Sequence, residues 1–161
     1  DKGLAKAEKK AGRATNEGIV HAYIHHNDRL GVLLELNCET DFVARTEQFR
    51  QLANDIALQI ANLNAQYVRR EDIPSAVIDA ERDLQRRRAL EEGKPENVVD
   101  RIVEGRMEKF FEDLVLFEQA FIKDDSVTIG QMVQRAIADL GENITLSRFA
   151  RFAVGESADT E

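Results

Sequence analysis

The sequence predicts an α+β fold, with a small three-stranded antiparallel sheet that is covered by helices and a largely helical middle segment. Two strand-like runs lie near the beginning of the chain, a third lies near its end, and helical apolar spacing fills the residues between them. The last strand must therefore cross back over the middle segment to join the first two. No Pro-, Gly- or Ser-rich linker interrupts residues 14–154, so we expect one domain there, preceded by a basic linker helix over residues 1–13 and followed by an acidic flexible tail over residues 155–161.

Composition and charge restrict the class of protein. The 161 residues are 43% hydrophobic and 32% charged, which is typical of globular proteins. No apolar run approaches the roughly 20 residues that are needed to cross a membrane. The formal net charge of −8 argues against broad nucleic-acid binding, because neutralising phosphates requires a basic surface. The single cysteine, Cys38, excludes a disulfide framework and favours a reducing compartment, so we expect a cytoplasmic protein with no membrane partner and no direct nucleic-acid binding.

The first two strands are expected to pair as a hairpin. Residues 18–25 are rich in β-branched and aromatic side chains, and residues 30–38 have apolar side chains at every second position. The connector, residues 26–29, is short and polar, which favours an antiparallel pair. The apolar face of the second strand consists of Leu30, Val32, Leu34, Leu36 and Cys38. This position favours a buried core cysteine over a catalytic thiol at Cys38.

Helical patterns lie on both sides of this hairpin. An Ala- and Lys-rich segment, residues 2–12, is typical of a short helix with Gly12 near its end. Residues 44–64 switch to helical spacing, which predicts one long helix with an apolar stripe. The stripe consists of Phe49, Leu52, Ile56, Ile60 and Leu63.

The middle segment is predicted to contain two further helices. Ser75 is the expected N-cap of a helix that runs to Glu92 and ends at Gly93, and its few apolar residues predict a largely exposed helix. Pro95 opens the next helix, whose apolar stripe is the strongest in the chain. That stripe consists of Val99, Ile102, Val103, Met107, Phe110, Phe111 and Leu114.

The last part of the chain is predicted to contain one helix and the third strand. Thr128 and Gln131 form a capping-box pattern for a helix that continues through Leu140. Gly141 is the expected end of this helix. Residues 144–154 then have the composition of a strand.

Side chains that could bind a metal or act in catalysis are few. His21 and His25 would lie roughly 13 Å apart, because each residue of a strand advances it by about 3.3 Å. Zinc needs its ligand nitrogens about 2 Å away, so these two histidines and His26 are interpreted as surface side chains. The sequence also lacks a Gly-rich phosphate loop, a Gly-x-Ser-x-Gly motif and a Cys-x-x-Cys motif. We therefore expect no metal, no cofactor and no enzymatic active site.

The most informative segment is residues 37–45, Asn-Cys-Glu-Thr-Asp-Phe-Val-Ala-Arg, between the second strand and the long helix. Taken alone, it is explained by helix capping, with Thr40 or Asp41 as the N-cap and Phe42 as a hydrophobic staple. The segment also resembles the Thr-Asp-Phe-Val signature of the elongation factor Ts family, including the Asn-Cys-Glu that precedes it. A nine-residue match is more specific than a capping pattern.

Further blocks that resemble this family follow in family order across almost the whole chain. One departure is Ala120, where the family commonly has Pro. The other blocks are residues 4–12, 103–110, 118–124, 140–144 and 148–152. On these residues, the chain is identified as a member of the elongation factor Ts family.

The resemblance implies a guanine-nucleotide exchange factor, which promotes GDP release from elongation factor Tu during translation elongation and performs no covalent chemistry. It implies that Phe42 inserts as an apolar wedge near the Mg²⁺ and phosphate site of elongation factor Tu. It further implies that Asp41 holds this wedge or bonds to the displaced element, with Thr40 and Val43 completing the contact.

A second contact is implied at the end of the last helix. Leu140 and Gly141 match family positions that approach the phosphate loop of elongation factor Tu, and a glycine permits close approach of the backbone. The same Gly141 is also explained as a helix C-cap.

The resemblance raises expectations about assembly and leaves alternatives open. Family members normally begin with a three-helix module that also grips elongation factor Tu, and we expect that this module was removed or is disordered. The chain resembles the short form of the family, which can act as a homodimer. We expect a bacterial cytoplasmic protein, with an organellar homologue as the alternative. One alternative is a ribosome- or RNA-associated binding module that uses the basic helix 2–13. Another is a small hydrolase or transferase that uses Asp41 and a histidine.

Overall fold

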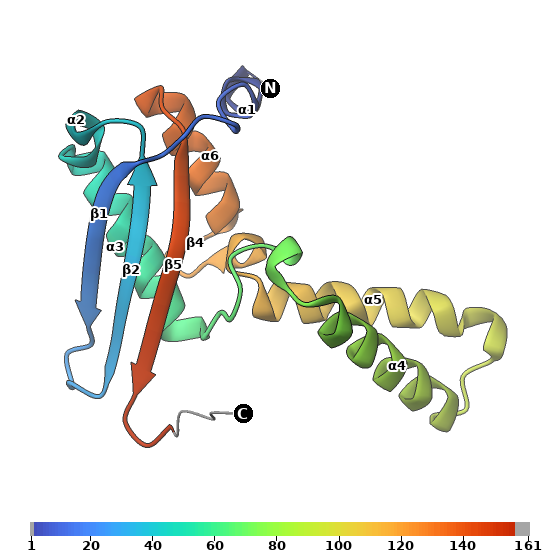
Figure 1. Ribbon diagram of the computed structural model, residues 1–161. Coiled ribbons are helices and arrows are strands. Elements are labelled where there is room, and N and C mark those ends of the chain that lie inside the picture. Colours follow the sequence, from blue (N-terminus) through green and yellow to red (C-terminus); the bar gives the residue numbers. More distant parts are fainter. Residues whose placement is uncertain (1, 157–161) are drawn as a thin grey trace. The chain divides into compact units, whose positions relative to one another are not determined.

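The structure is a computed structural model that describes residues 2–156 (Figure 1). The chain forms two compact units, of which the second, Ala65–Gln119, is inserted between the two parts of the first. Neither boundary has a Pro-, Gly- or Ser-rich sequence. Most of the predicted acidic tail, from residue 157 on, lies outside the described residues.

The first unit contains the predicted three-stranded antiparallel sheet. Its strands are β1 (Glu17–Ile24), β2 (Leu30–Cys38) and β5 (Ile144–Ala153), in the order β1-β2-β5. Glu17 pairs with Cys38 at one end of the hairpin, and Cys38 pairs with Ile144 of β5 at the same end. The α+β fold and the return of the last strand to the hairpin are therefore confirmed.

One face of the sheet is covered by two helices, α3 (Glu47–Leu63) and α6 (Ile129–Leu140), as Figure 1 shows. The period-two apolar face of β2 points toward them, since Val32, Leu34, Leu36 and Cys38 are all buried. The predicted apolar stripe of α3 meets this face as far as Ile60, whereas Leu63 at the end of the helix is 45% exposed. The largest fully buried side chains at this interface are Leu34, Leu36, Phe49, Ile56, Ile60, Ile129 and Ile144.

The N-terminal helix is shorter than the sequence predicts. α1 extends over Lys2–Glu8, and the residues that follow form turns rather than helix as far as Gly12. α1 packs against α6, where Ala7 is buried and a side chain on Gly3 would meet Ala138.

The helix predicted over 44–64 begins earlier and is interrupted. A short helix, α2 (Asp41–Ala44), precedes α3, and the break falls at Arg45 and Thr46. Thr46 causes the break, because its hydroxyl donates to the carbonyl of Val43 at 2.7 Å and accepts from the N–H of Phe49 at 3.2 Å. This side chain therefore ends one helix and caps the next.

The second unit is a helical hairpin. It contains α4 (Ser75–Glu91) and α5 (Glu96–Leu114), with short 3₁₀ turns at Arg70–Asp72 and Leu116–Glu118. α4 buries only Ala89, as its composition predicts, whereas α5 contributes most of the core. That core consists of Ile73, Ala89, Val99, Val103, Met107, Phe111 and Val115.

The ends of α4 differ in part from the prediction. Ser75 is the first helical residue rather than the N-cap, a position that Pro74 occupies without a side-chain cap. The N-cap prediction was therefore wrong by one position, because Ser75 already lies in the first turn of α4. Gly93 ends the helix with a positive φ of 78°, as expected.

A two-stranded ribbon before α6 was not predicted. It consists of β3 (Ala120–Phe121) and β4 (Asp124–Thr128), and these strands are too short to show a period in sequence. The side chain of Gln59 on α3 holds the ribbon, donating to the carbonyl of Ala120 and accepting from the N–H of Ile122, each at 2.9 Å. α6 then starts with the predicted capping box of Thr128 and Gln131.

The face of the sheet that points away from α3 and α6 exposes apolar side chains. We call this surface the outer sheet face. Its largest apolar side chains are between 49% and 74% exposed, and they are Val20, Ile24, Leu33 and Phe152. In the described part of the chain, no helix combines the length and the apolar character that a membrane span requires.

Candidate functional site

The Thr-Asp-Phe-Val segment forms the turn between β2 and α3. Thr40 is extended, with φ −128° and ψ 153°, and its hydroxyl accepts a hydrogen bond from the N–H of Val43 at 3.3 Å. Thr40 is thus the N-cap of α2, whereas Asp41 is the first helical residue. Because the cap starts one helical turn at Asp41, it also fixes the directions in which the side chains of the following residues point.

The side chains of α2 divide into a buried and an exposed pair. Val43 and Ala44 are 5% and 4% exposed and belong to the core. Phe42 is 77% exposed, so the hydrophobic-staple interpretation of this residue is wrong. Asp41 is also exposed, and its carboxylate accepts a hydrogen bond from Arg45 at 3.1 Å. A large aromatic side chain therefore projects from a short helix whose opposite side is anchored.

The second predicted contact lies at the end of α6. Leu140 is the last helical residue, and Gly141 has a φ of 76°, a left-handed conformation that favours glycine. The N–H of Gly141 donates to the carbonyl of Ile137 at 3.0 Å, which confirms the helix C-cap. Gly141 is exposed and nothing lies within 4 Å of the position that its Cβ would take.

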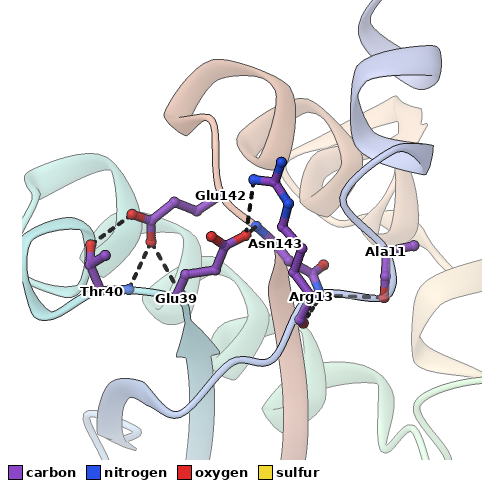
Figure 2. Close-up of polar contacts among 6 residues, drawn as sticks. All are labelled: Ala11, Arg13, Glu39, Thr40, Glu142 and Asn143. Atoms are coloured by element: carbon purple, nitrogen blue, oxygen red, sulfur yellow. Dashed lines mark hydrogen bonds and ion pairs between the residues drawn. The ribbon is translucent and has the colours of Figure 1, made fainter.

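The structure brings these two predicted regions together through a residue that the sequence did not single out. Figure 2 shows that the carboxylate of Glu142 accepts from the N–H groups of Glu39 and Thr40, at 3.1 and 2.9 Å. Its second oxygen accepts from the hydroxyl of Thr40 at 2.7 Å. We call this set of contacts the Glu142–Thr40 link. It joins residues that are 102 positions apart, so no local sequence pattern could have indicated it.

A reciprocal contact lies beside this link. The carboxylate of Glu39 accepts from the N–H of Asn143 at 2.9 Å and pairs with the guanidinium of Arg13 at 3.6 Å (Figure 2). Asn143 is buried, and its side-chain amide donates to the carbonyl of Arg13 at 2.9 Å. The segment after α1, the turn after β2 and the turn after α6 are thereby bonded to one another.

The cysteine next to the site is not suited to nucleophilic chemistry. Cys38 is fully buried, and this burial, together with the charge of Glu142, raises the pKa of its thiol to about 11. The thiol donates a hydrogen bond to the carbonyl of Thr40 at 3.1 Å. A thiol with this pKa stays protonated near neutral pH, which agrees with the interpretation of Cys38 as a core residue.

The histidines have ordinary partners. His21 bonds to Asn54 at 3.3 Å, His25 bonds to the hydroxyl of Tyr23 at 2.9 Å, and the rings of His25 and His26 lie 4.2 Å apart. Within residues 2–156, no group of three or more His, Cys, Asp or Glu side chains could hold a metal ion. Around α2, the described surface offers the apolar side chain of Phe42 and exposed turns of the backbone.

Comparisons with known proteins agree on one family. The family model described as "Elongation factor TS" matches residues 5–156. Elongation factor Ts of Syntrophomonas wolfei is 56% identical over 99% of this chain and 75% of its own length. The protein of the same name from Carboxydothermus hydrogenoformans is 56% identical over 96% of this chain and 71% of its own length, and that of a Thermoanaerobacter species is 54% identical over 99% and 78%. The chain belongs to the elongation factor Ts family of translation elongation factors.

Proposed function

We propose that this protein is a guanine-nucleotide exchange factor that promotes GDP release from elongation factor Tu without covalent chemistry. The observation that supports this proposal is the exposure of Phe42, 77%, on a short helix that is anchored in the core by Val43 and Ala44. Exposing a large aromatic side chain on a rigid turn has no benefit for folding, whereas such side chains are typical of binding contacts. The family to which the chain belongs supplies the kind of partner.

The proposed mechanism is a coupling between two binding events. If the exchange factor and GDP each weaken the binding of the other to elongation factor Tu, they must do so by the same factor. Burying one aromatic side chain stabilises a complex by about 2–3 kcal/mol, which corresponds to roughly 30- to 150-fold if all of it is coupled to release. The Mg²⁺ ion and the phosphates hold GDP through charge-assisted contacts, so displacing an element near them is the most effective use of this energy.

The turn at Leu140 and Gly141 is the proposed second contact. Gly141 already ends α6, but the open space around its Cα also allows another backbone to approach closely. This turn is bonded to the α2 turn through the Glu142–Thr40 link. Both contacts can therefore reach one partner surface.

We also propose that the protein forms a symmetric homodimer through its outer sheet face. The exposed apolar side chains of this face lie on neighbouring strands, and β1 and β5 are both edge strands of the sheet. Exposed apolar patches and free strand edges are commonly covered by association. A second copy of the chain supplies a surface of the same chemistry.

The test is a stopped-flow measurement of the release of fluorescent GDP from elongation factor Tu. The protein should accelerate release, and Phe42→Ala should lower the maximal rate by about tenfold or more, which corresponds to about 1.4 kcal/mol. Asp41→Ala should act in the same direction, and the double variant should be less than additive if both residues form one contact. Normal release by Phe42→Ala at saturation would refute the wedge.

The same assay separates this function from the RNA-associated alternative. A contact made by the basic residues of α1 with RNA should weaken steeply with salt, because it depends on counterion release. Binding to elongation factor Tu through Phe42 should depend little on salt. We also propose a bacterial cytoplasmic location, because the relatives named above are bacterial proteins.

A further inference from the structure

The carboxylate of Glu142 makes three hydrogen bonds to two consecutive residues, Glu39 and Thr40, directly before α2. We propose that Glu142 is a positioning residue that fixes the α2 turn, and with it Phe42, in the orientation that a partner meets. This inference rests on the proposed function and extends it to a residue that acts through Thr40 rather than through the partner.

The hydroxyl of Thr40 explains how the effect is transmitted. A threonine hydroxyl has one proton to donate and two lone pairs that accept. The hydroxyl donates its hydrogen bond to the carboxylate of Glu142 at 2.7 Å, so its lone pairs face the other way, and one of them accepts from the N–H of Val43. Without the carboxylate, the hydroxyl can rotate and donate elsewhere, which competes with the cap. Glu142 therefore sets the direction of the cap that starts α2.

The link is anchored on both sides. Cys38 and Ile144 form the last pair between β2 and β5, so the two turns leave the sheet side by side. The carboxylate of Glu39 accepts a hydrogen bond from the N–H of Asn143, and Asn143 is only 4% exposed. Asn143 is buried, so the turn after α6 is anchored in the core, and a movement of the α2 turn away from it must break the charge-assisted bonds of Glu142.

The consequence for binding is a change in affinity rather than in the maximal rate. If only a fraction of the molecules hold α2 in the competent orientation, the apparent affinity falls by that fraction. At saturating exchange factor, every molecule of elongation factor Tu is bound by a competent copy, so the maximal rate of release stays near that of the unchanged protein. Removing Phe42 itself has the opposite pattern, because the contact is then absent in every molecule.

The first arm of the test is amide hydrogen exchange, measured by NMR on the whole chain without partner. Glu142→Ala should speed exchange at the N–H groups of Thr40 and Val43, while amides in the middle of α3 keep their rates. Asp139→Ala is the matched control, since it removes the same charge near the same end of α6 but from a side chain that bonds to Gln48 on α3. Unchanged exchange at Thr40 and Val43 in Glu142→Ala would overturn the proposal.

The second arm is GDP release as a function of exchange-factor concentration. Glu142→Ala should raise the half-saturating concentration roughly tenfold, equivalent to about 1.4 kcal/mol, with a maximal rate within about twofold of the unchanged protein. Thr40→Val should also raise the half-saturating concentration, Thr40→Ser, which keeps the hydroxyl, should raise it less than Thr40→Val does, and the double variant Thr40→Val with Glu142→Ala should be no worse than Thr40→Val alone. Should Glu142→Ala melt early, Glu142→Gln keeps one acceptor oxygen and should give an intermediate value.

The outcomes separate the two proposals. If Phe42→Ala slows release but Glu142→Ala matches Asp139→Ala in both arms, the positioning role is refuted and the exchange function stands. If the unchanged protein does not accelerate release at all, the proposed function fails. Faster amide hydrogen exchange at Thr40 and Val43 in Glu142→Ala would then still establish that Glu142 orders the α2 turn.

Discussion

Replacing Phe42 with Ala should leave the stability of the fold almost unchanged, whereas the same replacement at Phe49 should destabilise it strongly. The two phenylalanines lie on adjoining helices, and one is 77% exposed while the other is 0% exposed. They are therefore matched in chemistry and opposite in environment.

The expected magnitudes follow from these exposures. Fully burying a Phe side chain contributes about 2–3 kcal/mol, so the small buried part of Phe42 contributes roughly 0.5 kcal/mol. Alanine regains a similar amount, since it is the better helix former by about 0.5 kcal/mol. Phe49→Ala instead leaves a cavity in the core and should cost about 3–5 kcal/mol. For a chain of this length, 1 kcal/mol shifts the melting temperature by about 2–4 °C.

The assay is thermal unfolding followed by circular dichroism, paired with GDP release measured well below each midpoint. We expect Phe42→Ala to melt within about 2 °C of the unchanged protein and Phe49→Ala to melt at least about 6 °C lower. Release should show the reverse order, slowed by Phe42→Ala and retained by Phe49→Ala. Equal losses of melting temperature in the two variants would refute the argument from exposure.

The remaining predictions concern other parts of the first unit and the hairpin. Cys38 should resist thiol reagents at pH 8 in the folded protein and react at once on unfolding, because its thiol is buried with a pKa of about 11. Since the pKa of this thiol is higher in the folded state than its ordinary value of 9.0, its contribution to stability should be lost as pH rises from about 9 to about 11, which urea titrations at several pH values can detect. Gly141→Ala should cost about 1–2 kcal/mol in urea unfolding, through backbone strain alone, and Gly141→Asn should cost less. Leu33→Glu should convert the proposed homodimer into a folded monomer, and an unchanged dimer mass by light scattering would contradict the assignment of the outer sheet face. Val103→Ala should lower the stability of the second unit by about 1–3 kcal/mol while GDP release stays normal, as calorimetry and stopped flow can show together.

The parts of the fold that were predictable are those in which neighbouring residues determine the structure. The alternation in residues 30–38 fixes which side of β2 is buried, and this prediction is confirmed. The capping box of Thr128 and Gln131 is likewise complete, with both reciprocal bonds present. In each case, the side chains that decide the conformation lie within a few residues of one another in sequence.

The features that were missed depend on contacts between distant residues or on competition between similar signals. Thr40 and Thr46 are both of a residue type that favours the N-cap position. The sequence interpretation placed Thr46 inside a single long helix and so did not separate α2 from α3. The exposure of Phe42 depends on how α2 leaves the sheet, which the capping pattern does not specify. Glu142 follows a helix end in sequence and has no periodic partner, so its role is visible only when β5 lies beside β2.

The pairing of β2 with β5 has a consequence for how the protein is made. Pairing Cys38 with Ile144 closes a long loop, at an entropic cost of roughly 4 kcal/mol. If the helical hairpin within this loop folds first, the cost falls by only about 0.6 kcal/mol for each halving of the flexible length. The β1–β2 hairpin and the α4–α5 hairpin contain only local contacts, so both can form while the ribosome is still adding residues. The sheet is completed only after Ile144–Ala153 has emerged. Chains that stop before this strand should therefore lack both the central sheet pair and the ordered α2 turn, and should be open to proteolysis.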